Sequence, residues 1–323
     1  MLICPACARV LTLVDGAECD GAEVRTGRLS CRGCGLEYPV REFVPRFVSS
    51  ENYAASFGFE WQRFSRTQYD RYSGTSESAV RFRNETRWCE RLDGEVIVEA
   101  GCGSGRFTEH AAATGATVIS FDYSDAIDVN RRANARFPNV HFLQADIHRI
   151  PLRAGLAGRL YCFGVLQHCP SPKAAFMSLL PVLKPGGELV MDVYLKSPMS
   201  LLYGRRFLRP FTSRMDPARL FRLVRGYVRW ALPLLARVRR VSPAAAGKLS
   251  AALAISDFGE RTDMTREMAR EWSLLDTFDT LSARYEKPQT LSAVRAWFLE
   301  AGMRDVDVRC GYNGIVGRGR TAS

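Results

Sequence analysis

Two groups of residues in this sequence combine residue types and spacings that can do chemistry. The first consists of two CxxC pairs near the start of the chain, and its members are Cys4, Cys7, Cys31 and Cys34. The second is the stretch VIVEAGCGSGRF, whose alternate glycines are Gly101, Gly103 and Gly105. Paired thiolates are metal ligands, and a glycine turn that opens a helix brings backbone amides close to a ligand.

The cysteine pairs predict one metal site. Each CxxC spacing lets two sulfurs reach the same ion from a tight turn, and four thiolates complete the tetrahedral shell of Zn²⁺. A redox pair would open a helix after a strand, which Pro5 and the doubling of the motif disfavour. We therefore expect a closed structural zinc site in a small module whose folding depends on the metal.

Around the glycine turn the hydrophobic pattern alternates between strand-like and helix-like segments. The strand-like runs VIVE, TVISFD, VHFLQAD, RLYCFGV and ELVMDVY are separated by runs of helical period. This alternation predicts an α/β fold with a parallel, doubly wound sheet. In such a sheet ligands bind at the carboxyl ends of the strands, where the strand order reverses.

Carboxylates stand at three of these strand ends, on Glu99, Asp122 and Asp146. Asp122 follows Gly101 by 21 residues, close to the spacing at which an acid pairs with ribose hydroxyls. Glu99 stands just before the turn, where a carboxylate repels phosphate and suits an ammonium or sulfonium group. The chain also lacks a GxxxxGK[ST] loop, so we expect a nucleoside ligand rather than one held by its phosphates.

In these motifs the sequence resembles the class I S-adenosylmethionine-dependent methyltransferases. VEAGCGSGRF, VISFDYS, FLQADI and FGVLQHCPSPKAAFMSLLPVLKPGGELVMDVY follow in that family's order over residues 90–194. The resemblance implies a mostly parallel seven-stranded sheet, with S-adenosylmethionine as cofactor. It implies that Gly101 and Gly103 pass beneath the methionine part and that Asp122 binds the ribose, while Asp146 and Ile147 frame the adenine. The predicted cofactor residues are Glu99, Gly101, Gly103, Gly105, Asp122, Tyr123, Asp146, Ile147 and Gly164.

The second cysteine pair lies in CRGCGLEYPVREFVPRF, which resembles the zinc ribbons related to the small activator subunit of tRNA and release-factor methyltransferases. In that family the second pair is followed by a strand, and residues 36–40 fit this step. The resemblance implies a zinc-ribbon module at 1–48.

Methyl transfer requires an acceptor held in line with the electrophilic methyl carbon. A hydroxyl acceptor also needs a general base, and His168 follows the fourth strand, where an acceptor can lie. We predict His168 as the catalytic residue; the alternative is a histidine that braces the loop. Farther along, Asp276, Asp279 and Tyr285 are candidate acceptor contacts, or alternatively helix caps and loop residues.

The net charge of +11 belongs to one segment. Residues 205–248 hold twelve basic residues and one acid, and the rest of the chain is neutral. Within it, RLFRLVRGYVRWALPLLARVRR predicts an amphipathic helix that Pro233 kinks or divides. The expected apolar stripe is Leu220, Leu223, Val224, Tyr227, Ala231, Leu234 and Leu235, and the arginines on another face are Arg222, Arg225 and Arg229. The segment packs as a helix pair with a solvated face, lies on a membrane surface, or binds nucleic acid.

These patterns divide the chain into three expected parts. We expect the zinc ribbon at 1–48, an aromatic-rich linker or lid at 49–92, and the methyltransferase domain at 93–323 with a helical insertion at 196–270. The chain has no apolar run of bilayer length and no evident signal peptide. The expected location is the cytoplasm, peripheral to the inner face of the membrane if 205–248 binds lipid.

The expected function is S-adenosylmethionine-dependent methylation of a polar small molecule, such as a sugar or a lipid-linked intermediate. Methylation of tRNA or rRNA is an alternative, suggested by the zinc ribbon and the arginine-rich insertion. The Asn-Pro-Pro-aromatic step of many base-amino methyltransferases is absent, which makes nucleic acid the less favoured partner. A further alternative is a binding module without turnover, and the sequence leaves the oligomeric state open.

Overall fold

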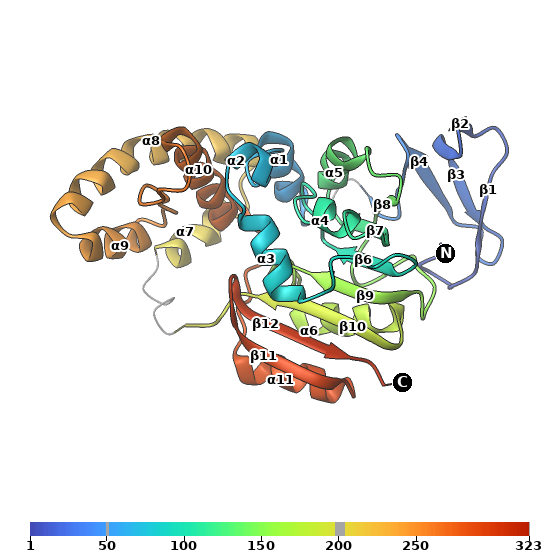
Figure 1. Ribbon diagram of the computed structural model, residues 1–323. Coiled ribbons are helices and arrows are strands. Elements are labelled where there is room, and N and C mark those ends of the chain that lie inside the picture. The colour runs from blue at the N-terminus through green and yellow to red at the C-terminus, as the bar shows by residue number, and fades with distance from the viewer. Residues whose placement is uncertain (50–51, 198–203, 323) are drawn as a thin grey trace. The chain divides into compact units, whose positions relative to one another are not determined.

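The computed structural model describes residues 1–49, 52–197 and 204–322, and the chain divides into two compact units (Figure 1). The sheet unit comprises Met1–Asn52, Ala79–Leu195 and Tyr285–Ser323, and the helical unit comprises Tyr53–Ser78 and Lys196–Arg284. Residues 50–51 of the expected linker, 198–203 of the expected insertion and residue 323 lie outside the described residues.

The sheet unit begins with a small antiparallel sheet, in the order β1-β3-β4-β5 with β2 paired to β3. Its strands are β1 (Leu11–Leu13), β2 (Glu18–Asp20), β3 (Glu23–Cys31), β4 (Glu37–Arg41) and β5 (Val44–Pro45). Its buried apolar cluster consists of Cys4, Cys31 and Tyr38. A core this small needs a metal or a crosslink to stay folded, which fits the ribbon predicted from the sequence.

A seven-stranded sheet is the main element of the sheet unit, in the order β11-β12-β10-β9-β6-β7-β8. Its strands are β6 (Val96–Ala100), β7 (Thr117–Asp122), β8 (Val140–Gln144), β9 (Ala157–Cys162), β10 (Leu183–Val193), β11 (Arg304–Gly311) and β12 (Gly314–Arg320). Strands β8, β7, β6, β9 and β10 pair in parallel, and β12 runs antiparallel to both β10 and β11. The predicted fold, a doubly wound and mostly parallel seven-stranded sheet, is confirmed.

Helices cover both faces of this sheet because its central strands are apolar on both sides. In β6, Ile97 belongs to one buried cluster and Val98 to the other, and Val118 and Ile119 divide in the same way in β7. The helices of this part are α3 (Glu77–Thr86), α4 (Thr108–Ala112), α5 (Ala126–Asn134), α6 (Pro172–Leu179) and α11 (Leu291–Glu300), with short 3₁₀ helices η1 (Leu166–His168) and η2 (Leu180–Val182). Residues of α6 and α11 join the cluster of Val98, and residues of α3, α4 and α5 join that of Ile97.

The strand order reverses at β6. The chain leads from β6 to β7 and β8 on one side, and then to β9 and β10 on the other. In open α/β sheets ligands bind outside the carboxyl ends of the strands at such a point. The glycine turn directly follows β6 and the His168 segment follows β9, so both stand at this edge.

The ribbon covers the edge strand β8. Phe47 N donates to Gln144 O at 2.8 Å, and Arg46 forms a parallel bridge to Gln144. Arg46 also pairs with Asp128 of α5 at 2.5 Å. Because an open edge strand is a template for unwanted pairing, these contacts protect the sheet.

The helical unit contains α1 (Ala55–Arg63), α2 (Asp70–Ser73), α7 (Arg205–Thr212), α8 (Pro217–Val241), α9 (Pro243–Ala252) and α10 (Arg266–Ser282). In its core Phe59 of α1 lies 5.9 Å from Phe221 and 5.7 Å from Phe278, measured between ring centroids. Part of the expected linker thus packs against the insertion helices. Within the described ranges, no helix combines the length and apolar character that crossing a membrane requires.

Helix α8 is continuous through Pro233, which narrows one expectation, and its buried face corrects another. Pro233 does not divide it, because Pro233 lies on the exposed side while buried Ala231 and Leu235 hold both halves in the core. Leu223 is exposed rather than part of the apolar stripe, because a buried face centred near Val224 leaves Leu223 about 100° away. The buried residues of α8 are Leu220, Phe221, Val224, Val228, Ala231 and Leu235.

Candidate active site and cysteine cluster

The glycine turn after β6 packs too closely for side chains. Gly101 has φ +77° and Gly105 has φ +93°, left-handed conformations that favour glycine. A Cβ on Gly101 would lie 2.3 Å from Val165 Cγ2, and one on Gly105 would lie 2.0 Å from Asn130 Oδ1. The Gly101 N–H donates to Phe121 O at 2.8 Å, so the turn stands against the end of β7.

Asp122, the last residue of β7, is hydrogen-bonded to this turn. Its Oδ2 accepts from Gly103 N at 2.9 Å, and its Oδ1 accepts from the amide and the hydroxyl of Ser124 at 2.8 and 2.7 Å. Burial raises the pKa of Asp122, and these donors oppose the rise. A carboxylate has about four lone-pair sites, so this one can still accept a hydroxyl hydrogen from a ligand.

The other predicted cofactor residues stand at or just after the ends of β6, β7, β8 and β9. Asp146 and Ile147 follow β8, and Asp146 Oδ1 accepts from His148 N at 2.9 Å. Burial and the charge of Asp146 raise the pKa of Tyr123, which places these two side chains near each other. Gly164 follows β9 with φ +74°. The structure therefore brings these residues to one edge of the sheet.

Glu99 stands at this edge, but its carboxylate is bound within the protein. The residue is 2% exposed, and its Oε2 accepts from Thr108 Oγ1 at 2.5 Å and from Ser120 Oγ at 2.7 Å. Burial raises the pKa of Glu99 to about 7, although these hydroxyl donors act in the opposite direction. Glu99 therefore ties the start of α4 to β7.

Two buried asparagines that the sequence patterns did not single out extend this network. Asn130 Nδ2 donates to Thr108 Oγ1 and to Ser120 Oγ, both at 2.9 Å. Asn134 Nδ2 donates to Gly105 O at 3.0 Å, so the network reaches the glycine turn. The available sequence signal was the spacing of the two asparagines, since residues four apart share one helix face.

A buried ion-pair cluster at the ends of β9 and β10 was also missed. Arg81 of α3 pairs with Asp192 of β10 and, at 3.4 Å, with Glu85. Asp192 Oδ1 accepts from Gly164 N at 2.5 Å, so the cluster fixes the end of β9. Burial and the charge of Asp192 raise the pKa of Glu85 to about 8. The one sequence signal for this cluster is the acid inside the apolar run ELVMDVY.

His168 lies on η1, and its ring is oriented by the segment that returns from the helical unit. Its Nδ1 lies 3.0 Å from Tyr285 O. Because a carbonyl only accepts, Nδ1 carries the hydrogen, and the neutral ring has its lone pair on Nε2. The Tyr194 ring meets the imidazole edge-on at 5.5 Å between centroids. This tautomer is the one that could act as a base through Nε2.

Gln167, beside His168, is a site candidate that the sequence interpretation missed. Its side chain is fully buried, and among the described residues neither amide atom has a hydrogen-bond partner. A buried unsatisfied polar group costs about 1–3 kcal/mol. A ligand hydroxyl, which both donates and accepts, would satisfy either amide atom.

The three candidate acceptor contacts do not all belong to the same unit. Asp276 and Asp279 lie on α10 of the helical unit, and Tyr285 belongs to the sheet unit. Burial first, and then the charges of Asp279 and Asp276, raise the pKa of Glu60 on α1 well above its usual range. The two aspartates thus lie near a third, buried carboxylate inside the helical unit, while Tyr285 contributes its backbone carbonyl to His168.

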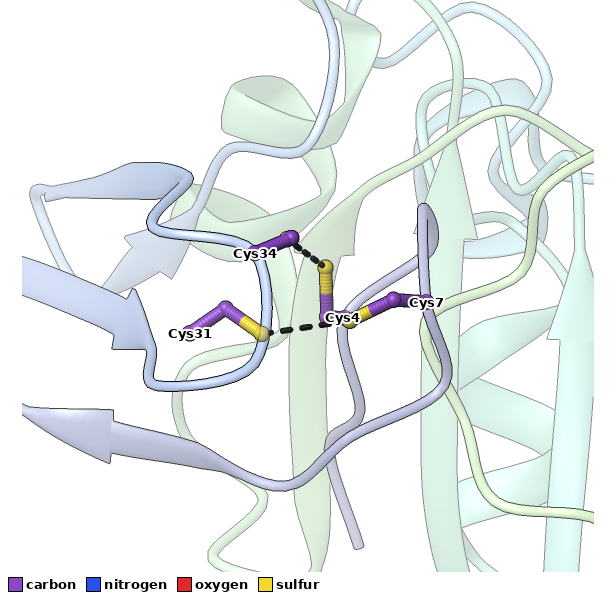
Figure 2. Close-up of side chains that lie close together, drawn as sticks. All are labelled: Cys4, Cys7, Cys31 and Cys34. Carbon is purple, nitrogen blue, oxygen red and sulfur yellow. Dashed lines mark hydrogen bonds between the residues drawn. The ribbon is translucent and has the colours of Figure 1, made fainter.

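The four predicted metal ligands converge in the ribbon (Figure 2). Cys4 and Cys7 come from one loop and Cys31 and Cys34 from the other, and all four sulfurs lie within 4.8 Å of one another. Cys4 Sγ lies 3.6 Å from Cys34 Sγ, and Cys7 Sγ lies 3.3 Å from Cys31 Sγ. A tetrahedron with Zn–S bonds of about 2.3 Å has S···S edges of roughly 3.8 Å. The sulfur positions therefore fit one Zn²⁺ ion with small adjustments.

The phenol of Tyr38 supports this cluster. Its hydroxyl lies 3.1 Å from Cys4 Sγ, and both side chains are buried. Burial opposes ionisation of Cys4, but hydrogen bonds from Tyr38 and from the backbone outweigh it and lower the pKa of the thiol to about 6. A thiolate is the form that binds a metal.

A family model and several known proteins match parts of this chain. A family described as methyltransferase domain matches residues 98–191. An uncharacterized chloroplastic methyltransferase of Arabidopsis thaliana is 29% identical over 167 residues, which is 49% of this chain and 46% of that protein. The ubiquinone biosynthesis O-methyltransferase of Coxiella burnetii is 29% identical over 114 residues, 35% of this chain and 49% of that protein. The chain thus spans about half the length of these curated relatives.

Among solved structures, that of the CurJ carbon methyltransferase aligns with a TM-score of 0.47 and 12% sequence identity. The alignment covers 84% of this chain and 62% of that one.

Proposed function

Because residues 98–191 form a class I S-adenosylmethionine-dependent methyltransferase domain, we propose that this chain methylates a hydroxyl group of a polar small molecule, such as a sugar or a lipid-linked intermediate. When bound, S-adenosylmethionine supplies an electrophilic methyl carbon on its sulfonium. The work left to the chain is to hold cofactor and acceptor in line and to remove the proton of the acceptor hydroxyl.

For the cofactor, the proposal assigns the ribose to Asp122 and the methionine part to the glycine turn. The hydrogen bond from Gly103 N to Asp122 Oδ2 supports this pairing, because it holds the carboxylate beside the turn at 2.9 Å. Asp146, Ile147 and Tyr123 frame the adenine at the neighbouring strand ends. Glu99 acts indirectly, by fixing α4 and β7 on either side of the turn.

The observation that carries the choice of a hydroxyl acceptor is the contact of His168 Nδ1 with Tyr285 O at 3.0 Å. It leaves Nε2 as the proton acceptor, and a general base contributes about 10²- to 10⁴-fold to such a reaction. Gln167 stands beside the base, its amide has no hydrogen-bond partner within the described part of the chain, and it orients the acceptor. The O-methyltransferase relative of Coxiella burnetii is consistent with this chemistry.

For the cysteine cluster, the proposal is one structural Zn²⁺ held by Cys4, Cys7, Cys31 and Cys34. Four thiolates leave no coordination position open, so the metal folds the ribbon and takes no part in transfer. Reduced thiolates of this kind belong to a reducing compartment, and the proposal places the protein in the cytoplasm.

Two other functions remain candidates. RNA methylation is the second candidate, since α8 exposes arginines without acidic neighbours on the same helix. A binding module without turnover is the third. A lipid-linked acceptor would bring the chain to a membrane, for which segment 205–248 is the candidate contact.

The test is a transfer assay with methyl-labelled S-adenosylmethionine and the purified chain. Small-metabolite, glycan, lipid and RNA fractions are offered in parallel. Label in a metabolite, glycan or lipid product, stable to the treatment that cleaves methyl esters, supports the proposal. Label confined to RNA replaces it with the second candidate. Cofactor binding without label in any fraction replaces it with the third.

A further inference from the structure

Helix α8 of the helical unit has a strongly one-sided charge. Its 25 residues include seven arginines and no acidic residue. One of them, Arg239, is paired with Asp257 and Glu260. The other six are Arg219, Arg222, Arg225, Arg229, Arg237 and Arg240, all exposed and without an ion pair among the described residues. No described acidic side chain pairs with the arginines of this face.

The same outward face carries large apolar side chains. Leu223 is 56% exposed, Trp230 is 61% exposed and Val241 is 88% exposed. At about 100° per residue these three fall within roughly 20° of one line along the helix. The six arginines occupy the adjoining arc. The outward face thus has an apolar ridge along one edge, next to the buried face, and cations on the other side of that ridge.

The helix is held in this orientation from behind. Its buried face packs in the core of the helical unit with Phe278 of α10. Tyr227 stacks on Trp230 at 6.3 Å and donates its hydroxyl hydrogen to Leu253 O at 2.7 Å. Figure 1 shows α8 along the upper edge of this unit, with α9 below it and α10 beside it. The indole of Trp230 is therefore supported in an exposed position rather than left loose.

We propose that α8 binds flat on an anionic membrane surface. In that position the arginines meet lipid headgroups, while Leu223, Trp230 and Val241 enter the boundary of the acyl region. The helix is about 37 Å long at 1.5 Å per residue, which gives a line contact rather than a point. The helix would lie in the interface without crossing the bilayer. This agrees with the absence of any membrane-crossing helix within the described ranges.

Lipid fits this face better than nucleic acid. Single-stranded nucleic acid is bound by cations together with aromatic rings on which bases stack. Two of the three ridge residues, Leu223 and Val241, are aliphatic and offer no ring for stacking. Their burial gains free energy where the partner provides an apolar phase. Membrane contact of this kind does not depend on methyl transfer, so either can fail without the other.

The test is flotation of the full chain with vesicles of equimolar phosphatidylcholine and phosphatidylglycerol. Each basic residue near such a surface contributes about 1 kcal/mol, so joint replacement of Arg222, Arg225 and Arg229 by Gln should weaken binding about 100-fold. The matched control replaces the exposed residues Arg83, Arg132 and Arg295 of the sheet unit by Gln, and should bind as the unchanged chain does.

A second variant separates insertion from charge attraction. The variant Leu223→Ser, Trp230→Ser and Val241→Ser keeps every arginine and removes the ridge. Its binding should fall more steeply with added salt than that of the unchanged chain, because only screened attraction remains. Equal binding by the two triple arginine variants overturns the proposal, as does absence of flotation at low salt. Tight retention of RNA in a parallel filter assay, with no flotation, transfers this surface to nucleic acid.

Discussion

Charge is handled in opposite ways in the two units. In the sheet unit the carboxylates of Glu99, Asp122 and Asp192 accept hydrogen bonds from groups near the strand ends, and Glu99 and Asp192 are fully enclosed. In the helical unit the arginines of α8 are exposed, and six of them have no ion pair among the described residues. A buried charge must be satisfied within the protein, whereas an exposed one is satisfied by water until a partner arrives. Buried carboxyl groups therefore fix the geometry of the site, and exposed arginines are available for an external surface.

Removing the metal should give the largest change in stability, because the ribbon has only a small buried cluster besides the metal site. Structural zinc contributes roughly 10 kcal/mol or more to the folding of such modules. We expect one Zn²⁺ per chain by elemental analysis. We also expect a chelator to expose the ribbon's amides to hydrogen exchange while β6 to β10 stay protected. Cys4→Ser should have the same effect, and Cys19→Ser, at an exposed cysteine outside the cluster, should not. Retained ribbon protection after complete zinc removal would contradict the structural role.

A loss of turnover without loss of cofactor binding should follow His168→Gln. Glutamine keeps a polar side chain but cannot take up a proton, so kcat should fall about 10²- to 10⁴-fold, while S-adenosylmethionine affinity stays unchanged. His141→Gln, on the exposed side of β8, is the control. If His168→Gln retained full kcat with a hydroxyl acceptor, the histidine would be a brace of the loop and no base.

A pH-dependent change in stability should follow Glu99→Gln, because the buried carboxyl titrates differently in the folded chain. Its pKa is about 7 when folded, against an ordinary value of 4.5. The folded state therefore favours the protonated form. Stability from this source is fully present below pH 4.5 and is lost as the pH rises through 7.

Urea denaturation at both ends of this window measures the effect. Between pH 4.5 and about pH 8, the free energy of unfolding of the unchanged chain should fall by roughly 3 kcal/mol relative to Glu99→Gln. Glutamine can still accept the hydrogen bonds of Thr108 and Ser120, so the network should survive. Parallel pH profiles for the two chains would mean that Glu99 ionises as readily in the fold as in the unfolded chain.

Much of the sheet unit could be predicted from the sequence, because its signals are local. A glycine that must adopt a left-handed conformation, such as Gly101, stands at a fixed place after a strand. The acid that ends the next strand, Asp122, follows at a fixed spacing. The cysteine pairs are also local motifs: one turn brings together the two sulfurs of each pair, and the pairing of β1 with β3 accompanies the convergence of all four.

The missed residues depend on contacts between distant segments. Arg81 and Asp192 are 111 positions apart, and neither stands in a motif that names the other. The orientation of His168 depends on Tyr285, 117 positions away. The helical unit was harder for another reason. Its apolar face was misplaced at Leu223 because several faces of α8 hold apolar residues, and packing against α10 decides which one is buried.

Calorimetric titration of S-adenosylmethionine into the unchanged chain and into Asp122→Ala tests most directly whether Asp122 binds the cofactor. The carboxylate should accept a charge-assisted hydrogen bond from the ribose, so the variant should bind more weakly by about 1.5–3 kcal/mol, or roughly 10- to 150-fold. Asp93→Ala, an exposed carboxylate paired with Arg91, should leave the affinity unchanged, and melting curves should show that each variant is folded. Equal affinity of Asp122→Ala and the unchanged chain would contradict the placement of the cofactor at this edge of the sheet.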